Sequence, residues 1–228
     1  MQSGRGPGHR GRVVNPLALI SIALAYPDRD LLEARPEIVA AAAGLPASAA
    51  VTALREFLRW WAAEPPADLE RRYAETFDFS RRTALDLTYY TYGDRRQRGL
   101  ALLALRRRYS AAGLEFEGVE LPDHLPVVLE FAALAPEAGG ELLAEFRPVI
   151  ELLRLALERA ASPFAGLLRA LCLTLPELTS ADREDLHRMV REGPPSESVG
   201  LEPFAPPEVM PEPRRRTAAP CAARAQAS

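Results

Sequence analysis

VTALREFLRWW, residues 51–61, is the stretch of sequence that decides the fold class of this chain. Its apolar residues recur every three or four positions, at Val51, Leu54, Leu58 and Trp61. That spacing places them on one face of an amphipathic helix, because an α-helix turns once in 3.6 residues. The pair Pro65-Pro66 then closes the segment.

The same helical spacing extends in both directions from this segment. A first helix is expected before Pro27, with the buried stripe Leu17, Ile20, Ala23 and Leu24. Another should begin near Ala67 and bring Leu69, Tyr73 and Phe77 onto one side. No alternating β-branched run and no Asn-Gly hairpin signal interrupts the pattern. The sequence therefore predicts an all-α fold, a single antiparallel bundle with short connections.

Turn and capping signals set the later boundaries. Ser80 is a candidate N-cap of a helix, and Asp94 with Gln97 can form a capping box for a helix that Gly113 stops. The segment Leu121-Pro122-Asp123 should open the next helix, whose inward face carries Leu125, Val128, Leu129 and Ala132 and which Pro136 ends or kinks. The remaining helices are expected at residues 137–160, 163–173 and 182–191.

The two ends differ from this pattern. Residues 1–14 carry Gly, Arg and Pro with almost nothing to bury, which predicts a flexible arm. From residue 193 onwards, prolines recur too often for a helix, so residues 193–228 should be extended or disordered. We therefore expect one helical domain at residues 15–192 between two flexible ends.

Composition excludes several classes of protein. The net charge is −3 and all 28 basic residues are arginine, so the whole chain has no electrostatic drive toward nucleic acid. Two cysteines and three dispersed histidines form neither a disulfide framework nor a metal motif. We expect no bound metal or cofactor and a cytoplasmic location. The apolar stretch at residues 16–25 mimics an export signal but is far too short to span a bilayer, so no membrane insertion is expected.

A few residues carry chemistry that helix packing alone does not explain. Tyr89, Tyr90 and Tyr92 crowd into four positions, which suits either a peptide groove or the core. Arg81 and Arg82 are either solvated or at the rim of a groove that recognises carboxylates or carbonyls. Asp123 and His124 are either an orienting acid with a base or a helix cap with a polar first-turn residue. Glu75 and Glu130 are either half-buried acids or ordinary surface residues.

Two stretches together resemble the NarJ family of nitrate reductase molybdenum cofactor assembly chaperones. The first is YAETFDFSRRT at residues 73–83, which runs into LTYYTYGD at residues 87–94. The second is ELPDHLP at residues 120–126, followed by Leu129-Glu130-Phe131. LAYPD at residues 24–28 and GLEPF at residues 200–204 are also similar to that family. The resemblance is collinear and covers roughly residues 15–204, but not the ends of the chain.

The resemblance implies a helical chaperone of the TorD-like redox enzyme group, without catalysis of its own. Its expected partner is the N-terminal segment of the apo catalytic subunit of a respiratory nitrate reductase, held for molybdenum cofactor insertion, with cofactor delivery proteins as possible further partners. The alternatives are a chaperone for another twin-arginine molybdoenzyme and a small helical enzyme that uses Asp123, His124 and Glu130. By the same resemblance, the residues expected at the client groove or in its support are Glu75, Phe77, Phe79, Arg81, Arg82, Tyr89, Tyr90, Tyr92, Asp123, His124 and Glu130.

Overall fold

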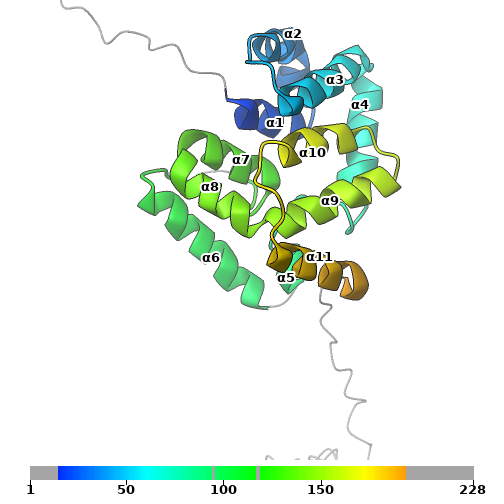
Figure 1. Cartoon of the computed structure of the whole chain (residues 1–228). Helices are drawn as coiled ribbons and strands as arrows, with labels where there is room; N and C mark the ends of the chain where they lie inside the picture. Colours follow the sequence, from blue (N-terminus) through cyan, green and yellow to red (C-terminus); the bar gives the residue numbers. More distant parts are fainter. Residues whose placement is uncertain (1–14, 94–95, 117–118, 194–228) are drawn as a thin grey trace, which may run out of the picture. The chain divides into compact units, whose positions relative to one another are not determined.

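The structure, a computed structural model, describes residues 15–93, 96–116 and 119–193. Over these residues the chain forms eleven α-helices and one π-helical turn, η1, and no strand, which confirms the all-α prediction (Figure 1). The first elements are α1 (Pro16–Leu24), α2 (Arg29–Ala43), α3 (Ala49–Ala63), α4 (Pro66–Tyr73), η1 (Ala74–Asp78), α5 (Tyr89–Tyr92) and α6 (Arg96–Ala111). The others are α7 (Leu125–Leu134), α8 (Pro136–Glu145), α9 (Arg147–Arg159), α10 (Phe164–Cys172) and α11 (Ser180–Glu192).

The core lies where α1, α3, α7 and α10 meet. α3 packs along α10, and α1 packs along α7, so segments far apart in sequence lie side by side (Figure 1). Trp61, Ile20, Leu129 and Phe164 are almost completely buried there. The Ser21 hydroxyl on α1 donates a 2.7 Å hydrogen bond to the carbonyl of Pro126 on α7, which satisfies a polar group inside this contact.

The helix at residues 51–61 forms as predicted. α3 begins after Ser48, whose side chain accepts a 3.1 Å hydrogen bond from the amide of Val51. Its predicted apolar face is buried, together with Phe57. The helix ends at Ala63, and Pro66 then occupies the first position of α4, where a missing N–H costs nothing.

The segment after Pro66 contains a feature that the apolar spacing does not reveal. Leu69, Tyr73 and Phe77 are all buried, as predicted, but they are four residues apart and would drift around a regular α-helix. Residues Ala74–Asp78 form a π-helical turn instead, in which the amide of Phe79 donates to the carbonyl of Ala74 at 3.3 Å. The wider turn brings the third side chain back toward the same face.

Three predictions of the elements were wrong. Residues 137–160 form two helices rather than one, because the chain breaks at Phe146 and Pro148 enters the first turn of α9 without an amide hydrogen to donate. Ser80 does not begin a helix, because residues 80–88 form turns before the short α5. Asp123 does not cap α7, because His124 occupies the N-cap position and Asp123 binds elsewhere.

α6 packs loosely against the bundle. Only Leu105 and Tyr109 are buried, while Leu100 and Leu103 face solvent. The helix is followed by Gly113, which has a φ of 78° that favours glycine. The predicted cap Asp94, the N-terminal arm and the tail beyond residue 193 lie outside the described residues.

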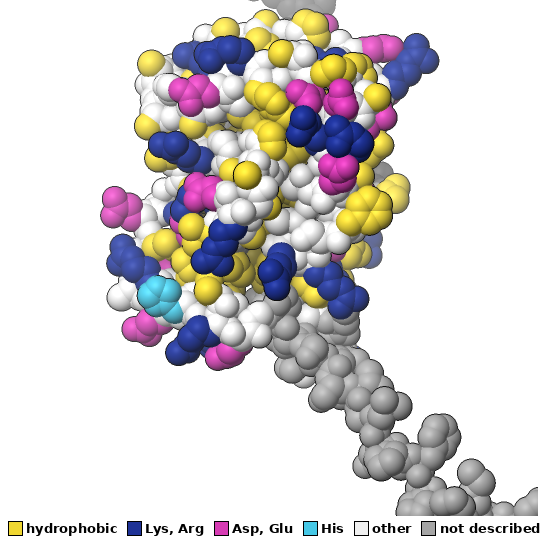
Figure 2. Space-filling view, turned by 90° about the vertical axis from the view of Figure 1, so that its right-hand side faces the viewer, with side chains coloured by type: hydrophobic (Ala, Val, Ile, Leu, Met, Phe, Trp, Pro, Cys, Tyr) yellow, Lys and Arg dark blue, Asp and Glu magenta, His cyan; other side chains and the backbone are white. Residues whose placement is uncertain are grey.

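The surface mixes charges of both signs with apolar patches. On the face shown in Figure 2, arginines and acidic residues are interspersed around apolar areas, as the small net charge suggests. In the described part of the chain, no helix is long and apolar enough to cross a lipid bilayer.

Candidate functional site

Two segments that resemble the chaperone family meet through a backbone bridge. The amide of Leu87 donates to the carbonyl of Asp123 at 3.0 Å, and the amide of Leu125 donates to the carbonyl of Leu85 at 2.9 Å. These bonds make an isolated antiparallel bridge between Asp86 and His124. Residues 85–88 are thereby fixed against the start of α7.

The side chain of Asp123 is fully buried at this bridge. One carboxylate oxygen accepts hydrogen bonds from the amide of Thr88 at 3.0 Å, from the Thr88 hydroxyl and from Arg98 at 3.4 Å. The other oxygen has no hydrogen-bond partner among the described residues. A buried carboxylate is stable only when it keeps its hydrogen-bond donors. Asp123 therefore holds Thr88, in the turn before α5, and Arg98, on α6, in place.

Asp86 completes the cluster from the segment that pairs with His124 in the bridge. Its carboxylate lies 3.2 Å from Nδ1 of His124 and 3.0 Å from Nη2 of Arg98. The hydrogen bond with His124 lowers the pKa of Asp86; burial opposes that shift, and the bond from Arg98 reinforces it. We call Asp86, Thr88, Arg98, Asp123 and His124 the polar clamp.

The polar clamp does not form a catalytic set with Glu130. Asp123 is buried and engaged with Thr88, whereas Glu130 lies exposed on α7 and lines a separate groove. In the part of the chain that the structure describes, no cluster of His, Cys, Asp and Glu is suited to hold a metal ion. The contacts of Asp123 and His124 are those of residues that hold the bridge and the start of α7 in place.

The predicted aromatic residues divide between the core and the surface. Phe77 packs in the core, with its ring centroid 4.9 Å from those of Tyr73 and Phe164. Tyr90 is buried, and its hydroxyl lies 3.0 Å from the carbonyl of Arg82 and 2.9 Å from that of Ala84. Burial raises the pKa of Tyr90, so that its hydroxyl stays protonated and donates. Tyr89 and Tyr92 are half-buried.

Phe79 is 83% exposed, directly after the π-helical turn. The turn ends there because the Thr83 hydroxyl donates to the carbonyl of Thr76 and fixes the chain that follows. Arg81, Arg82 and Glu75 are also on the surface, and Glu75 pairs with Arg71 at 3.2 Å. Beside them lies a polar cavity of about 280 Å³, lined by Arg72, Glu75, Thr76, Ser80, Thr83 and residues 160–163.

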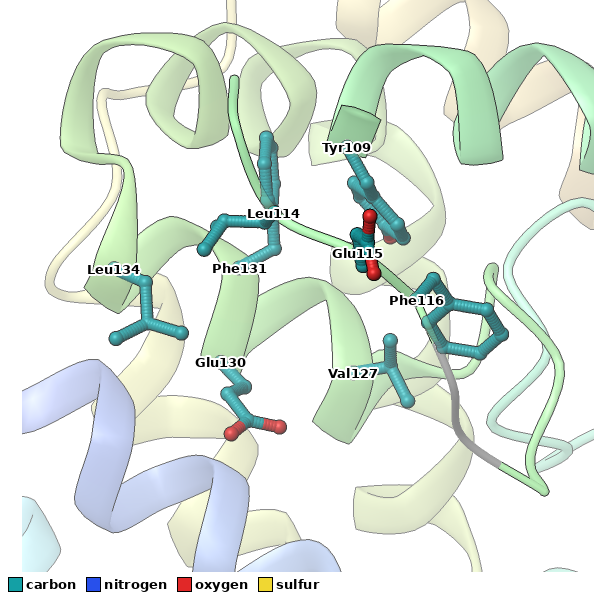
Figure 3. Close-up of a pocket in the computed structure, with 8 residues that line it drawn as sticks. All are labelled: Tyr109, Leu114, Glu115, Phe116, Val127, Glu130, Phe131 and Leu134. Carbon is teal, nitrogen blue, oxygen red and sulfur yellow. The ribbon is translucent and has the colours of Figure 1, made fainter. Parts of the chain in front are cut away.

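A second, more apolar cavity lies between α7 and the end of α6 with the loop that follows it, at residues 114–116 (Figure 3). We call it the α6–α7 groove; its volume is about 210 Å³, enough for one or two side chains. Tyr109 and Phe131 form its back wall, with ring centroids 4.4 Å apart. Glu115 and Glu130 place carboxylates at its rim. The other lining residues are Leu114, Phe116, Val127 and Leu134.

Of the groove residues, only Glu130 was among the predicted site residues. The sequence signal for this groove is the loop after Gly113, which contains the large apolar residues Leu114 and Phe116. A solvent-exposed loop normally carries polar residues at such positions. Both remain half-buried, and the guanidinium of Arg106 lies 5.5 Å from the ring centroid of Phe116. Apolar side chains that stay partly exposed in a hollow are typical of a binding surface.

Comparison with known proteins identifies the family. The model of the family described as "Nitrate reductase delta subunit" matches residues 42–170, which contain the π-helical turn, the polar clamp and the α6–α7 groove. The chain belongs to the nitrate reductase delta subunit family. This confirms the resemblance on which the predicted function rests.

Several curated proteins are similar to this family member. It is 37% identical over 155 residues to the nitrate reductase molybdenum cofactor assembly chaperone NarJ of Escherichia coli, covering 66% of this chain and 65% of that one. It is 32% identical to a Bacillus subtilis protein named as a NarJ chaperone, covering 70% of this chain and 87% of the other. It is 39% identical to the nitrate reductase-like protein NarX of Mycobacterium tuberculosis over 68% of this chain, but spans only 23% of NarX.

A solved structure shares the fold. A protein from Archaeoglobus fulgidus, described as a "Putative Redox Enzyme Maturation Protein", aligns with a TM-score of 0.55 and 26% identity, covering 75% of this chain and 97% of that one. The NarJ relatives are named as assembly chaperones and not as catalysts. These names agree with the prediction of a chaperone of the redox enzyme maturation type rather than a small helical enzyme.

Proposed function

We propose that this chain is a cytoplasmic assembly chaperone that binds the apo catalytic subunit of a nitrate reductase and keeps it competent for molybdenum cofactor insertion. Membership of the nitrate reductase delta subunit family carries the proposal, together with the similarity to proteins named as NarJ chaperones. In this function the chain needs a surface for an unfolded client segment and no reactive centre of its own.

The α6–α7 groove is the surface that best suits such a segment. It offers an aromatic wall, apolar sides and two carboxylates at the rim, which is the arrangement that an amphipathic peptide requires: apolar anchors and a few polar contacts that fix its orientation. We propose that the N-terminal segment of the client places an apolar side chain against Leu114, Phe116 and Leu134, over the buried rings of Tyr109 and Phe131, while Glu130 contacts a polar or basic group beside it.

The other predicted site residues fall into two groups in this proposal. Phe79, Arg81, Arg82 and Glu75 belong to a surface that contacts the client beyond its first segment, beside the polar cavity. The remaining predicted residues support the site from within or from its edge, and they are Phe77, Tyr89, Tyr90, Tyr92, Asp123 and His124. Cofactor delivery proteins are proposed as further partners of the chaperone–client complex.

Calorimetric titration with a peptide that copies the N-terminal segment of the catalytic subunit tests the proposal. Leu134→Asp should weaken binding by about tenfold or more, because it places a charge in the apolar groove. Leu173→Asp is the matched control, because Leu134 is 50% exposed and Leu173 is 48% exposed but lies outside the groove. Phe79→Ser tests the second surface against the full-length apo subunit.

The outcomes separate the possible clients and sites. Saturable binding that Leu134→Asp weakens and Leu173→Asp does not would support the groove. Equal loss in both variants would place the site elsewhere. Binding only to the corresponding peptide of another twin-arginine molybdoenzyme would replace the nitrate reductase client with that enzyme, and no binding to either peptide by the folded chain would contradict a role in holding the client's N-terminal segment.

A further inference from the structure

A stripe of four residues runs along the solvent side of α6. Arg96, Leu100, Leu103 and Arg107 follow one another at intervals of four, three and four residues, so they share one face of the helix. Leu100 is 68% exposed and Leu103 is 45% exposed. We call these four residues the outer stripe of α6.

The packing of α6 on the bundle does not explain the outer stripe. The opposite side of the helix carries Leu105 and Tyr109, which are buried against the bundle. α6 is therefore apolar on two opposite sides, and a helix of that kind is normally covered on both. In the described chain nothing covers Leu100. A helix that only faced solvent on this side would normally carry a polar residue at that position.

Gly99 gives a second observation on the same side of the helix. Glycine inside a helix is less favourable than alanine, so it usually has a packing reason. Gly139 on α8 has one, because an added Cβ would lie 2.2 Å from the Cα of Ala132. Gly99 has none within the chain, because a Cβ added there would meet no atom within 4 Å. The missing side chain leaves room for the backbone of an outside partner.

The charges of α6 define the chemistry of that partner. The helix contains no acidic residue, and its basic residues are Arg96, Arg98, Arg106, Arg107 and Arg108. Arg96 and Arg107 are exposed and have no hydrogen bond or ion pair with any described residue. They lie about 16 Å apart along the helix, since each residue rises 1.5 Å. A partner should therefore place carboxylates at both ends of an apolar contact.

We propose that the outer stripe of α6 is a docking site for an acidic amphipathic helix of another protein. A second copy of this chain does not suit the stripe, because an antiparallel pair of α6 helices would place Arg96 opposite Arg107. A lipid surface is also less suited, because two leucines offer little of the large apolar face that an interfacial helix inserts. The proposal goes beyond the client groove and does not depend on it.

Fluorescence anisotropy on the full chain tests this proposal with a designed 21-residue peptide (roughly six helical turns). The peptide carries leucines at the seam positions of a heptad repeat and glutamates beside them, and a second peptide has lysine in place of each glutamate. The double variant Leu100→Ser, Leu103→Ser should raise the Kd of the acidic peptide by about tenfold or more. Arg107→Glu should weaken the acidic peptide and strengthen the lysine peptide.

Gly99→Ala is the sharpest variant, because it separates binding from folding. Alanine should keep the thermal midpoint of unfolding unchanged or raise it, yet weaken the acidic peptide by blocking close approach. Leu173→Ser and Arg169→Glu, both on the exposed side at α10, serve as controls that should not change binding.

Three results would overturn the proposal. The first is the absence of saturable binding of the acidic peptide. The second is binding that the outer-stripe variants leave unchanged. The third is binding to phosphatidylglycerol vesicles with the same dependence on Leu100 and Leu103 while the peptide does not bind, which would make the stripe a lipid contact.

Discussion

Asp86 and Asp123 show how two carboxylates at one place take different roles. Asp123 is fully buried and fixes the backbone and hydroxyl of Thr88, whereas Asp86 is partly exposed and pairs with His124. Arg98 reaches both, at 3.0 Å from Asp86 and 3.4 Å from Asp123. Because the two carboxylates have different partners and different exposure, substitutions of Asp86 and Asp123 should have different effects. The first should change how the free energy of unfolding depends on pH, and the second should lower it at neutral pH.

Asp86→Asn should change how stability depends on pH. The pKa of Asp86 is lowered in the folded chain, so the unfolded chain binds its proton first as the pH falls below about 3.9. The ionised carboxylate therefore contributes stability above that pH, and the contribution is lost as the pH falls through the lowered folded pKa. Urea unfolding at neutral and acidic pH measures this. Between the two pH values, the free energy of unfolding should fall by about 1 kcal/mol less in Asp86→Asn than in the natural chain.

Glu37→Gln is a suitable control for that experiment, because Glu37 is exposed on α2. It should leave the acid-dependent loss of stability unchanged. An Asp86→Asn variant with the same acid dependence as the natural chain would show that the ionised carboxylate of Asp86, paired with His124 and Arg98, does not stabilise the fold.

Asp123→Ala should destabilise the fold by about 3 kcal/mol, because it leaves the amide and hydroxyl of Thr88 without their buried carboxylate acceptor and removes one of the two carboxylates beside Arg98. Asp123→Asn should cost less, since the amide oxygen can still accept from Thr88. Chemical denaturation of both variants at neutral pH measures the difference. A loss of stability in Asp123→Ala no larger than that of a surface substitution would contradict this role.

For single residues, the sequence singled out Asp123 and His124 but did not predict their contacts. Asp123 and His124 stood out, but their partners Asp86 and Thr88 are more than thirty positions away. Helical periodicity carries no information on such distant pairs. Tyr89, Tyr90 and Tyr92 divided between core and surface for the same reason, because adjacent residues in a short turn point in different directions.

α7 and α8 approach each other closely where Gly139 meets Ala132. Gly139 is buried against Ala132, so that the two helices cross with their backbones almost touching. Helical periodicity does not reveal this contact. A glycine inside a predicted helix looks like a weak point, and only the crossing shows that its missing side chain is required.

Gly139→Ala should destabilise the fold by about 2 kcal/mol or more, because the new Cβ would lie 2.2 Å from the Cα of Ala132 and would force the helices apart. Gly140→Ala is the matched control, since nothing lies within 4 Å of a Cβ at that position. It should be neutral or slightly stabilising, because alanine favours the helix. Urea unfolding of the two variants measures the contrast, and equal effects would contradict the close crossing.

Element boundaries were predictable where a cap or a proline marks them and not where the backbone departs from the α-helix. α3 follows its apolar stripe, and Pro66 marks the start of α4. The π-helical turn at Ala74–Asp78 was missed, since the spacing of Leu69, Tyr73 and Phe77 fits an α-helix nearly as well. The groove between α6 and α7 was missed because it depends on how two elements pack, and Leu114 and Phe116 carry no periodic signal.

A second buried charge in the described chain, besides Asp123, lies where the late helices meet the core. Arg147 is buried at the start of α9, donates to the carbonyl of Pro176 at 3.1 Å and contacts Glu151 at 3.1 Å. Burial by itself would raise the pKa of Glu151, but the bonds from Arg154 and Arg147 outweigh it and hold that pKa below its ordinary value. The segment after α10 is thus fixed to α9 by charge as well as by apolar packing.

Cys172 lies beside this network and can report on the integrity of the whole fold. Burial raises the pKa of its thiol to about 12, so at pH 8 only about one thiol in 10⁴ is the reactive thiolate. In a Cys221→Ser background, alkylation of native protein should therefore be slow, and it should accelerate in urea along the same curve as the loss of helix measured by circular dichroism. Fast alkylation without denaturant would mean that α10 opens locally, and the polar contacts around Arg147 would then not secure the late helices against the core.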